Sequence, residues 1–377
     1  MKINLVMGFF LPVPPVAGGA TEKSWYLLAR EFAARGHEVT IYSRHWRGWP
    51  DDEQREGVHH VRLPGSNHTR SLRRNLLLDF LWSLRISRRL QPADITIAHC
   101  VTLPLWLGRL RKAGKVVLMC GRMPKGQYRR YRRIDRILAV SEPVREAILA
   151  ENTALAPTIR ITGYPIRWAE LAAAHPPRPD GTPLSIGFVG RLHPEKGLDL
   201  LAAALVQLAA MPGLPAWQVL LCGPQEIAEG GAGPDYVASL RQKLSPLPKG
   251  TWSIQPPIYA EPRLQTLYRG LDLFCYPSTS ATGETFGVAV AEAMAAGAVP
   301  VVSGLACFRG LVNAGENGLV FDHTATDAAA RLAGALASLL LSPERRRQLA
   351  ARARPDVARY DFPAYAEELL RDFSALK

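Results

Sequence analysis

The sequence lacks any run of 18 apolar residues, so we expect no membrane-spanning helix. Cysteine is scarce, and the five residues are scattered without a CxxC pair: Cys100, Cys120, Cys222, Cys275 and Cys307. An odd, scattered set is typical of reduced thiols in a cytoplasmic protein and does not suit a disulfide framework. Short-period repeats and low-complexity tracts are also missing, which argues against a solenoid.

Motifs for common phosphate and metal sites are missing as well. The chain has no GxxxxGK(S/T) loop, and the glycine pair in "PPVAGGATEK" (14–23) lacks the GxGxxG spacing of a dinucleotide fold. It has no Asp-x-Asp and no His/Cys/Asp cluster with ligand spacing, so we expect no metal and no resident cofactor. The start, "MKINLVMGFFLPVPP", contains a lysine and an apolar run, but its three prolines favour a strand and a loop over a signal peptide.

Positive charge is abundant in the first half of the chain only. The formal net charge is +13, but residues 1–180 hold 29 Lys and Arg against 15 Asp and Glu, whereas residues 181–377 hold 17 against 18. One basic group is "GRMPKGQYRRYRRIDR" (121–136), and the second consists of Arg70, Arg73, Arg74, Arg85, Arg88 and Arg89. A solvated basic surface, a phosphate-bearing substrate and an anionic membrane face all fit this pattern. No RNA- or DNA-binding motif accompanies it, so we expect no nucleic-acid partner.

Strand-like apolar runs alternate with helical patterns along all 377 residues, and the composition, 47% hydrophobic, is that of a globular protein. The first half predicts a helix over about 22–35 and strands at 3–10, 38–43, 58–63, 95–99, 116–119 and 137–140. The pattern restarts after "HPPRPDGTP" (175–183), with strands at 184–190, 217–222, 272–276 and 299–303. Such alternation indicates right-handed βαβ units on mostly parallel sheets, the α/β class.

The restart divides the chain into two Rossmann-like domains. We predict the first over 1–168, a linker over 169–182, the second over 183–355, and a closing amphipathic helix over 356–377. Because parallel sheets bind ligands beyond the carboxyl ends of their strands, the candidate site residues are those on the loops that follow strands.

The first such loop is "GFVGRLHPEKG" (187–197), which brings Arg191 and Lys196 just before a helix. Two cations beside a helix N-terminus suit a diphosphate, because the free N–H groups and the cations both attract anions. Ordinary surface charges on a loop would explain this stretch equally well if it stood alone.

The second such loop is "GETFGVAVAE" (283–292). The backbone of residues 285–288 would offer N–H groups at another helix start, where Gly287 permits close approach of a ligand. Glu292, about a turn and a half into the helix, is placed to bind two vicinal hydroxyls, and Glu284 to reach a sugar. In the structural alternative, Glu284 complements the helix dipole and Glu292 is a solvated helix residue.

Two further candidates lie in the first half. Gly18 and Gly19 separate a strand from a helix, where paired glycines line a phosphate or admit an acceptor hydroxyl. "DITIAHC" (94–100) ends a strand with His99 at the expected crevice edge. A lone histidine at a strand end is more often structural than functional, so both interpretations of His99 stay open.

Taken together, these residues resemble retaining glycosyltransferase family 4 (glycosyl transferases group 1), whose GT-B fold has two facing Rossmann-like domains and a deep interdomain cleft. The matching pieces span nearly the whole chain: "GGA", "DITIAH", "AVSEPVRE" (139–146), "GFVGRLHPEKGLDLL", "LDLFCYPS" (271–278) and "GETFGVAVAEAMAAGAVPVV" (283–302). The most specific of them is the Glu-x7-Glu element followed by "AMAAG", in combination with Arg191 and Lys196.

The resemblance implies a role for each candidate residue. The catalytic residues would be His99, Glu284, Arg191 and Lys196, and the donor-binding residues Gly18, Gly19, Arg191, Lys196, Glu284, Thr285, Phe286, Gly287, Val288 and Glu292. The two cations and the amides of the second loop would hold a diphosphate, Glu292 the ribose, and Glu284 and His99 the sugar. The first domain would bind the acceptor and the second the donor, with the final helix returning to the first domain.

The implied reaction moves a hexose from a nucleotide sugar, with UDP as the default carrier, to an acceptor hydroxyl, with retention and without a metal. Cations and amides aimed at the leaving diphosphate would stabilise the charge that it gains in the transition state. The two-carboxylate arrangement of glycoside hydrolases does not apply, and a front-face reaction fits better. The alternatives are an epimerase or phosphorylase of the same fold, or a non-catalytic nucleotide-binding protein.

The basic first half suggests an anionic or lipid-linked acceptor at the cytoplasmic face of the inner membrane, as in bacterial envelope polysaccharide, lipopolysaccharide or glycolipid synthesis.

Three departures from the family pattern bear on the donor sugar. Tyr164 in "ITGYPI" replaces an Asn, the polar "STSATG" precedes Glu284, and "LLCGP" has Cys222 where Gly-Asp-Gly is common.

Overall fold

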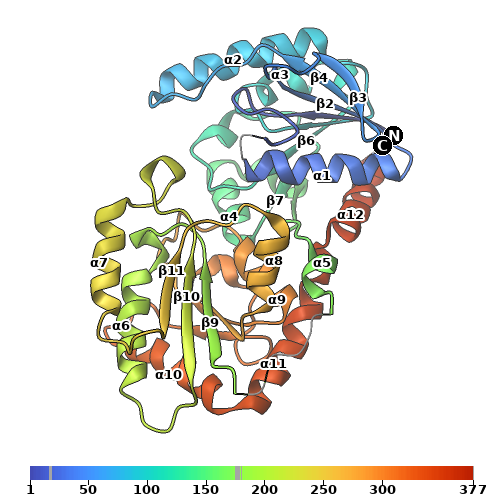
Figure 1. Ribbon diagram of the computed structural model, residues 1–377. Helices are drawn as coiled ribbons and strands as arrows, with labels where there is room; N and C mark the ends of the chain where they lie inside the picture. Colours follow the sequence, from blue (N-terminus) through green and yellow to red (C-terminus); the bar gives the residue numbers. More distant parts are fainter. Residues whose placement is uncertain (17–18, 175–178, 180, 377) are drawn as a thin grey trace. The chain divides into compact units, whose positions relative to one another are not determined.

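The computed structural model describes residues 1–16, 19–174, 179 and 181–376 (Figure 1). The chain forms two compact units: unit 1 comprises Met1–Pro165 and Phe362–Lys377, and unit 2 comprises Ile166–Asp361. Each unit is built on its own sheet, so the predicted α/β class with two parallel-sheet domains is confirmed. Unit 2 begins at Ile166, just inside the first domain that we predicted over 1–168, and ends at Asp361, a few residues beyond the predicted boundary at 355. The final helix belongs to unit 1.

Unit 1 contains an eight-stranded sheet in the order β3-β4-β2-β1-β5-β6-β7-β8. Its strands are β1 Lys2–Val6, β2 Glu38–Arg44, β3 Asp52–Arg55, β4 Val58–Leu63, β5 Ile95–Ala98, β6 Lys115–Cys120, β7 Arg136–Ala139 and β8 Ile159–Ile161. Its helices and 3-10 turns are α1 Ala20–Ala34, α2 Leu72–Arg89, α3 Pro104–Leu107, η1 Arg111–Ala113, η2 Gln127–Arg130, α4 Glu142–Glu151, η3 Thr153–Thr158 and α12 Phe362–Ala375. The neighbouring strands are parallel except for β3, which pairs antiparallel with β4 at the edge.

Unit 2 contains a six-stranded parallel sheet in the order β11-β10-β9-β12-β13-β14, which is the strand order of a Rossmann fold. Its strands are β9 Leu184–Val189, β10 Trp217–Cys222, β11 Trp252–Gln255, β12 Leu273–Tyr276, β13 Val299–Ser303 and β14 Leu319–Phe321. Its helices and 3-10 turns are α5 Trp168–Ala172, η4 Pro194–Lys196, α6 Leu198–Ala209, η5 Ile227–Glu229, α7 Pro234–Leu244, α8 Glu261–Arg269, α9 Val288–Ala296, η6 Ala306–Phe308, α10 Ala328–Leu341, α11 Pro343–Asp356 and η7 Ala358–Tyr360.

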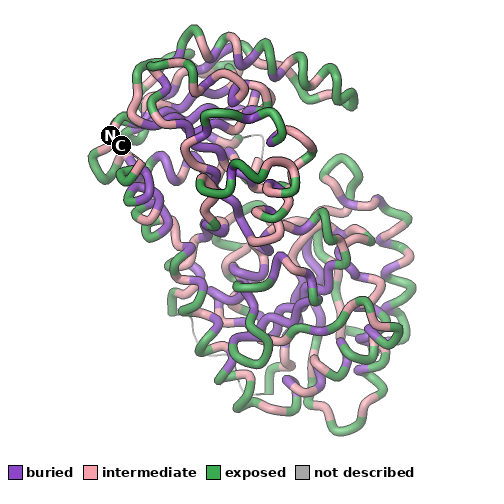
Figure 2. Tube along the Cα trace, turned by 180° about the vertical axis from the view of Figure 1, so that it is seen from behind, coloured by how far each residue is buried: buried purple, intermediate pink, exposed green. Residues whose placement is uncertain are grey.

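Helix α1 shows how the sequence pattern produces these layers. Trp25, Leu28 and Phe32 recur at helical spacing, and all three are buried in unit 1. The helix stops before Gly36, whose φ of 79° lies in the left-handed region that glycine adopts at little cost. Figure 2 shows the buried segments in the middle of each unit, with exposed backbone on the outside.

Strand order places a topological switch point in each unit. In unit 2 it lies between β9 and β12, and in unit 1 between β1 and β5, because in both sheets the chain crosses to the opposite side there. Ligands of such folds bind beyond the carboxyl ends of the strands at these points. The loops after β9, β12, β1 and β5 are therefore the positions that matter for function.

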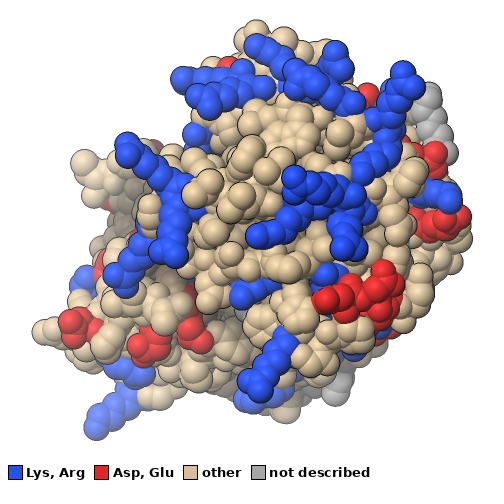
Figure 3. All heavy atoms as spheres, turned by 90° about the horizontal axis from the view of Figure 1, so that it is seen from above, with Lys and Arg blue, Asp and Glu red and all other residues tan. Residues whose placement is uncertain are grey.

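The surface of unit 1 is basic on the side where α2 lies. Seen from that side, lysine and arginine side chains form several groups and outnumber the acidic ones (Figure 3). Within the described residues, none of the helices combines the length and the apolar character that crossing a bilayer requires. All five cysteines are buried and unpaired, as expected for reduced core thiols.

Helix α12 is held to unit 1 by a charge as well as by apolar packing. Phe373 is buried, with its ring 6.3 Å from that of Phe32 on α1. Asp372, only 6% exposed, pairs with Arg136 of β7 and with Arg160 of β8, both at 2.9 Å. One buried carboxylate therefore balances two arginines from neighbouring strands.

We predict that Asp372→Asn lowers the free energy of unfolding of unit 1 by about 3 kcal/mol, because it leaves Arg136 without its buried counter-charge and Arg160 with Glu368 alone. Urea denaturation followed by circular dichroism measures this change. The matched control is Glu367→Gln on the same helix, whose pair with Arg371 is exposed on both sides and is worth less than about 1 kcal/mol. Equal effects of the two substitutions would contradict the prediction.

Candidate functional site

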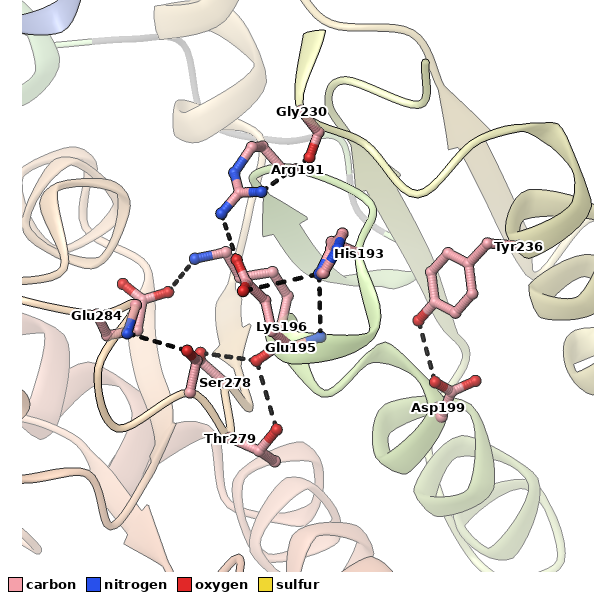
Figure 4. Close-up of polar contacts among 12 residues, drawn as sticks. Arg191, His193, Glu195, Lys196, Asp199, Gly230, Tyr236, Ser278, Thr279 and Glu284 are labelled. Atoms are coloured by element: carbon pink, nitrogen blue, oxygen red, sulfur yellow. Dashed lines mark hydrogen bonds and ion pairs between the residues drawn. The ribbon is translucent and has the colours of Figure 1, made fainter. Parts of the chain in front are cut away.

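The loops after β9 and β12 are joined through their backbones (Figure 4). The carbonyl of Glu195 accepts hydrogen bonds from the Thr279 amide at 3.0 Å and from the Ser278 hydroxyl at 3.1 Å. Gly197, with φ 70°, caps α6 where a Cβ atom would lie 2.0 Å from the Pro277 carbonyl oxygen. Only glycine permits this approach, so the two loops form one surface at the switch point of unit 2.

Arg191 lies on this surface with its guanidinium held from two sides. It donates a hydrogen bond to the Gly230 carbonyl at 2.8 Å and forms an ion pair with Glu195, four residues further on (Figure 4). The exposed fraction of the Arg191 side chain is 40%, so the side chain is accessible to a ligand. The structure thus orients this cation before any anion binds.

Lys196 and Glu284 form a buried ion pair between the two loops. The exposed fractions of their side chains are 7% and 8%, respectively. The hydroxyl of Tyr276, at the end of β12, donates a hydrogen bond to the same carboxylate at 3.1 Å. Burial and the neighbouring Glu284 raise the pKa of Tyr276 well above its ordinary value, so this hydroxyl stays a donor. Two residues that we predicted to contact different parts of a ligand contact each other here.

Helix α9 begins at Val288, as the sequence predicted, and Gly287 is its N-cap. Gly287 has φ 93°, and a Cβ atom there would lie 2.8 Å from the Phe308 ring. The side chain of Phe286 is buried against Tyr360, with the ring centroids 5.1 Å apart, while Thr285 and Val288 are half-buried. The backbone of this segment, rather than its side chains, is therefore the part suited to a ligand.

Glu292 lies on α9 about a turn and a half from its start. Its carboxylate accepts a hydrogen bond from the hydroxyl of Tyr268 at 2.9 Å, and its side chain is half-buried. Tyr268 is buried, and burial together with Glu292 raises the pKa of Tyr268 well above its ordinary value. Tyr268 therefore orients Glu292 as Tyr276 orients Glu284.

In unit 1, Gly19 and His99 lie on the loops that flank the switch point. Gly19 is the N-cap of α1 with φ 100°, and a Cβ atom there would lie 2.2 Å from the carboxylate of Glu22. Gly18 lies outside the described residues. His99 follows β5 directly, and its amide donates to the Val6 carbonyl at 2.9 Å.

The imidazole of His99 is neutral at physiological pH. Its ring contacts the indole of Trp25 with centroids 4.9 Å apart, and its Nε2 is buried without a hydrogen-bond partner among the described residues. Burial lowers the pKa of His99 from 6.5 to about 3. The hydrogen-bonding capacity of this nitrogen is therefore not used by any described residue.

Sequence reasoning missed four residues that support these candidates: Glu22, Glu195, Tyr268 and Tyr276. Tyr276 had a signal, because it is a polar residue at the carboxyl end of an apolar strand. Glu22 is buried in the first turn of α1, and burial raises the pKa of this carboxyl group. Across the described part of the chain, no group of three or more His, Cys, Asp or Glu residues is arranged to hold a metal ion.

We predict that His99 makes the protein less stable in acid. Its pKa is lower in the folded state than in the unfolded state, so its contribution is present above pH 6.5 and is lost as the pH falls towards 3. Urea denaturation at pH 7 and pH 5 should show about 1–2 kcal/mol less loss of unfolding free energy for His99→Asn than for the wild type. His68→Asn, at an exposed position, is the control. An unchanged pH difference in His99→Asn would refute the burial argument.

Named glycosyltransferases are similar to about half of this chain. A D-inositol 3-phosphate glycosyltransferase of Rhodococcus erythropolis is 33% identical over 189 residues, which are 50% of this chain and 40% of that protein. A phosphatidyl-myo-inositol mannosyltransferase of Mycolicibacterium smegmatis is 29% identical over 207 residues, which are 54% of this chain and 49% of that protein. The chain thus spans less than half the length of these relatives.

Solved structures share the fold over the full chain. Sucrose-phosphate synthase from Thermosynechococcus elongatus has a TM-score of 0.76 at 20% identity and covers 100% of this chain and 98% of its own. Anabaena HepE in complex with UDP has a TM-score of 0.73 at 16% identity, with complete coverage of both chains. At these identities the likeness shows the fold, which is the GT-B fold.

Two family models match, and together they cover most of the sequence. Residues 17–154 match Glycosyltransferase Family 4, and residues 174–356 match Glycosyl transferases group 1. The first match lies within unit 1 and the second within unit 2. The chain therefore belongs to the group 1 and family 4 glycosyltransferases.

Proposed function

We propose that this chain transfers a sugar from a nucleoside diphosphate to an acceptor hydroxyl, with retention of the anomeric configuration and without a metal ion. One observation carries the proposal: Arg191, Lys196 and the start of α9 converge on the switch point of unit 2, with Glu284 and Glu292 on the same loop and helix. Membership of the glycosyltransferase family supports the same reaction class.

The donor's diphosphate is assigned to Arg191, Lys196 and the first amides of α9. These cations are paired with Glu195 and Glu284, so a diphosphate would compete with the carboxylates for them. Glu292 is assigned to the ribose hydroxyls and Glu284 to the sugar. UDP is the proposed nucleotide because it is the commonest sugar carrier, and structures of the same fold are named as complexes with UDP and UDP-glucose.

The chemistry proposed is a front-face substitution. The anomeric bond to the diphosphate breaks, the acceptor oxygen attacks from the same face, and a donor phosphate oxygen takes the acceptor's proton. Arg191, Lys196 and the α9 amides stabilise the negative charge that grows on the leaving diphosphate. His99, as a neutral imidazole, would hold a sugar hydroxyl in place and would not act as an acid.

The acceptor is proposed to carry negative charge or a lipid, as in bacterial envelope polysaccharide, lipopolysaccharide or glycolipid synthesis. The basic surface of unit 1 supports an anionic acceptor. The relatives named above act, by their names, on inositol 3-phosphate and phosphatidyl-myo-inositol, which are both anionic. The protein would work in the cytoplasm, at the membrane surface when its acceptor is a lipid.

The first test is thermal unfolding with UDP, GDP, ADP, dTDP or CMP in the presence of EDTA. A ligand at about a hundred times its dissociation constant stabilises the folded state by roughly 2.7 kcal/mol. We expect UDP to raise the unfolding temperature most, with EDTA making no difference. A shift that disappears with EDTA would refute metal independence, and a larger shift with another nucleotide would reassign the donor.

The second test is Arg191→Ala, measured by calorimetric titration with the nucleotide that binds. Loss of a charge-assisted hydrogen bond should weaken binding about 10- to 100-fold. Lys243→Ala is the control, because it also removes a cation paired with a carboxylate, Asp199, on the same unit. Unchanged binding in Arg191→Ala, together with unchanged binding in Lys196→Ala, would remove the proposed phosphate site.

A further inference from the structure

Helix α2 presents apolar side chains on two sides. Trp82 and Ile86 are fully buried in unit 1, as expected for the core-facing side of an amphipathic helix. A second group remains exposed: Leu72 at 71%, Leu77 at 57%, Phe80 at 42%, and Leu76 and Leu81 at 39% each. Figure 2 shows α2 as exposed or half-buried along most of its length. Five large apolar side chains on one helix are more than the scattered exposure that a surface normally shows.

Arginines accompany these apolar side chains. Six exposed arginines lie on α2 or just before its first residue: Arg70, Arg73, Arg74, Arg85, Arg88 and Arg89. Viewed down the helix axis at 3.6 residues per turn, Leu76 and Leu81 mark the two edges of the exposed apolar stripe. Arg73 and Arg88 lie within this stripe, and Arg74 and Arg85 lie beside it. The one acidic residue of the helix, Asp79, is buried. We call the five exposed apolar residues and the six arginines the α2 face.

A second basic segment is tied to the same part of unit 1. Asp79 of α2 accepts a hydrogen bond from the Thr102 amide at 2.7 Å, and the Tyr131 hydroxyl donates to the Val101 carbonyl at 2.8 Å. Tyr131 belongs to the segment 125–133, in which the exposed cations are Lys125, Arg129, Arg130, Arg132 and Arg133. Both basic segments thus hold the loop that begins directly after His99.

We propose that the α2 face docks onto the surface of an anionic phospholipid bilayer. A cationic helix with exposed leucines and a phenylalanine is suited to lie in the interface, with its apolar side chains among the acyl chains and its arginines at the headgroups. Arginine stems reach past the apolar side chains to the charged layer. Docking would bring the loop after His99, and with it the acceptor side of unit 1, to the membrane.

Other occupants fit the α2 face less well. A second copy of the chain would set the arginines of one face against those of the other, which is repulsive. A nucleic acid would use the arginines but leave the leucines exposed to water. The docking is independent of the proposed sugar transfer, since it involves unit 1 alone and requires no nucleotide.

Vesicle sedimentation of the full chain without nucleotide tests the proposal. We expect vesicles that contain phosphatidylglycerol to bind the protein at least about tenfold more strongly than pure phosphatidylcholine vesicles. Leu77→Ser/Phe80→Ser should weaken binding to the anionic vesicles about tenfold or more. Arg73→Glu/Arg74→Glu should abolish the preference for anionic lipid.

Matched controls lie on unit 2. Ile227→Ser/Leu341→Ser removes two apolar side chains that are at least as exposed as Leu77 and Phe80. Arg345→Glu/Arg347→Glu makes the same charge change on the arginine-rich helix α11. The vesicle affinity of each of these two control variants should lie within about twofold of that of the wild type if the α2 face is the part that binds the membrane. All of the variants alter exposed positions, and their unfolding temperatures should match that of the wild type, except for a small decrease in Leu77→Ser/Phe80→Ser, where Phe80 loses its contact with the Trp106 ring.

Three results would overturn the proposal. The first is equal binding of the wild type to the two kinds of vesicle, and the second is a loss of vesicle binding in the unit 2 controls as large as in the α2 variants. The third is a wild-type protein that binds no vesicles but forms a dimer in light scattering, which Leu77→Ser/Phe80→Ser dissociates. The nucleotide-induced rise in unfolding temperature separates this proposal from the proposed function. It should persist in the α2 variants, and its absence in the wild type would count against sugar transfer and leave membrane docking intact.

Discussion

The buried ion pair between Lys196 and Glu284 is the contact on which the candidate site depends. Both side chains are more than 90% buried, so each charge needs the other, and removing either would leave an uncompensated charge in the interior. The pair joins the loop after β9 to the loop after β12. It therefore also sets the position of Arg191, five residues before the lysine, and of the N-terminus of α9, four residues after the glutamate.

Around this pair, hydrogen bonds within the protein orient the other candidate side chains. Tyr276 and Tyr268 stay protonated and each orients one glutamate, while the Gly230 carbonyl and Glu195 orient Arg191. Donors that are already aimed need little reorganisation when charge develops on a ligand, which is the source of most electrostatic stabilisation in enzymes. In unit 1 the corresponding position is held by His99, which burial keeps neutral. The switch point of unit 2 thus carries charged side chains, whereas His99 at the strand end of unit 1 is uncharged.

Much of this could be predicted from the sequence, because the signals are local. Buried strands such as β9 and β13 are short apolar runs, and Gly287 followed by an alanine-rich stretch indicates the start of α9. Two of the strands that were not predicted, β3 and β14, had a weaker signal. β3 reads "DEQR" and is mostly exposed, and it is a strand because it pairs with the edge of β4. β14 is three residues long and is defined by its neighbour β13.

The sequence by itself determined the α/β class, the two strand arrays, and the candidate residues at the ends of strands, where folds of this kind bind ligands. Only the tertiary structure decided how those residues pair. Lys196 and Glu284 are 88 positions apart, and their contact exists because β9 and β12 are neighbours in the sheet. The arginines of the α2 face were visible in the sequence as a basic group, but the exposure of its leucines was not, because leucines at helical spacing are typical of core residues. The spacing of apolar residues indicates whether a segment favours a helix or a strand. The pairing of strands and the face that a helix buries are instead decided by packing between segments that are distant in the sequence.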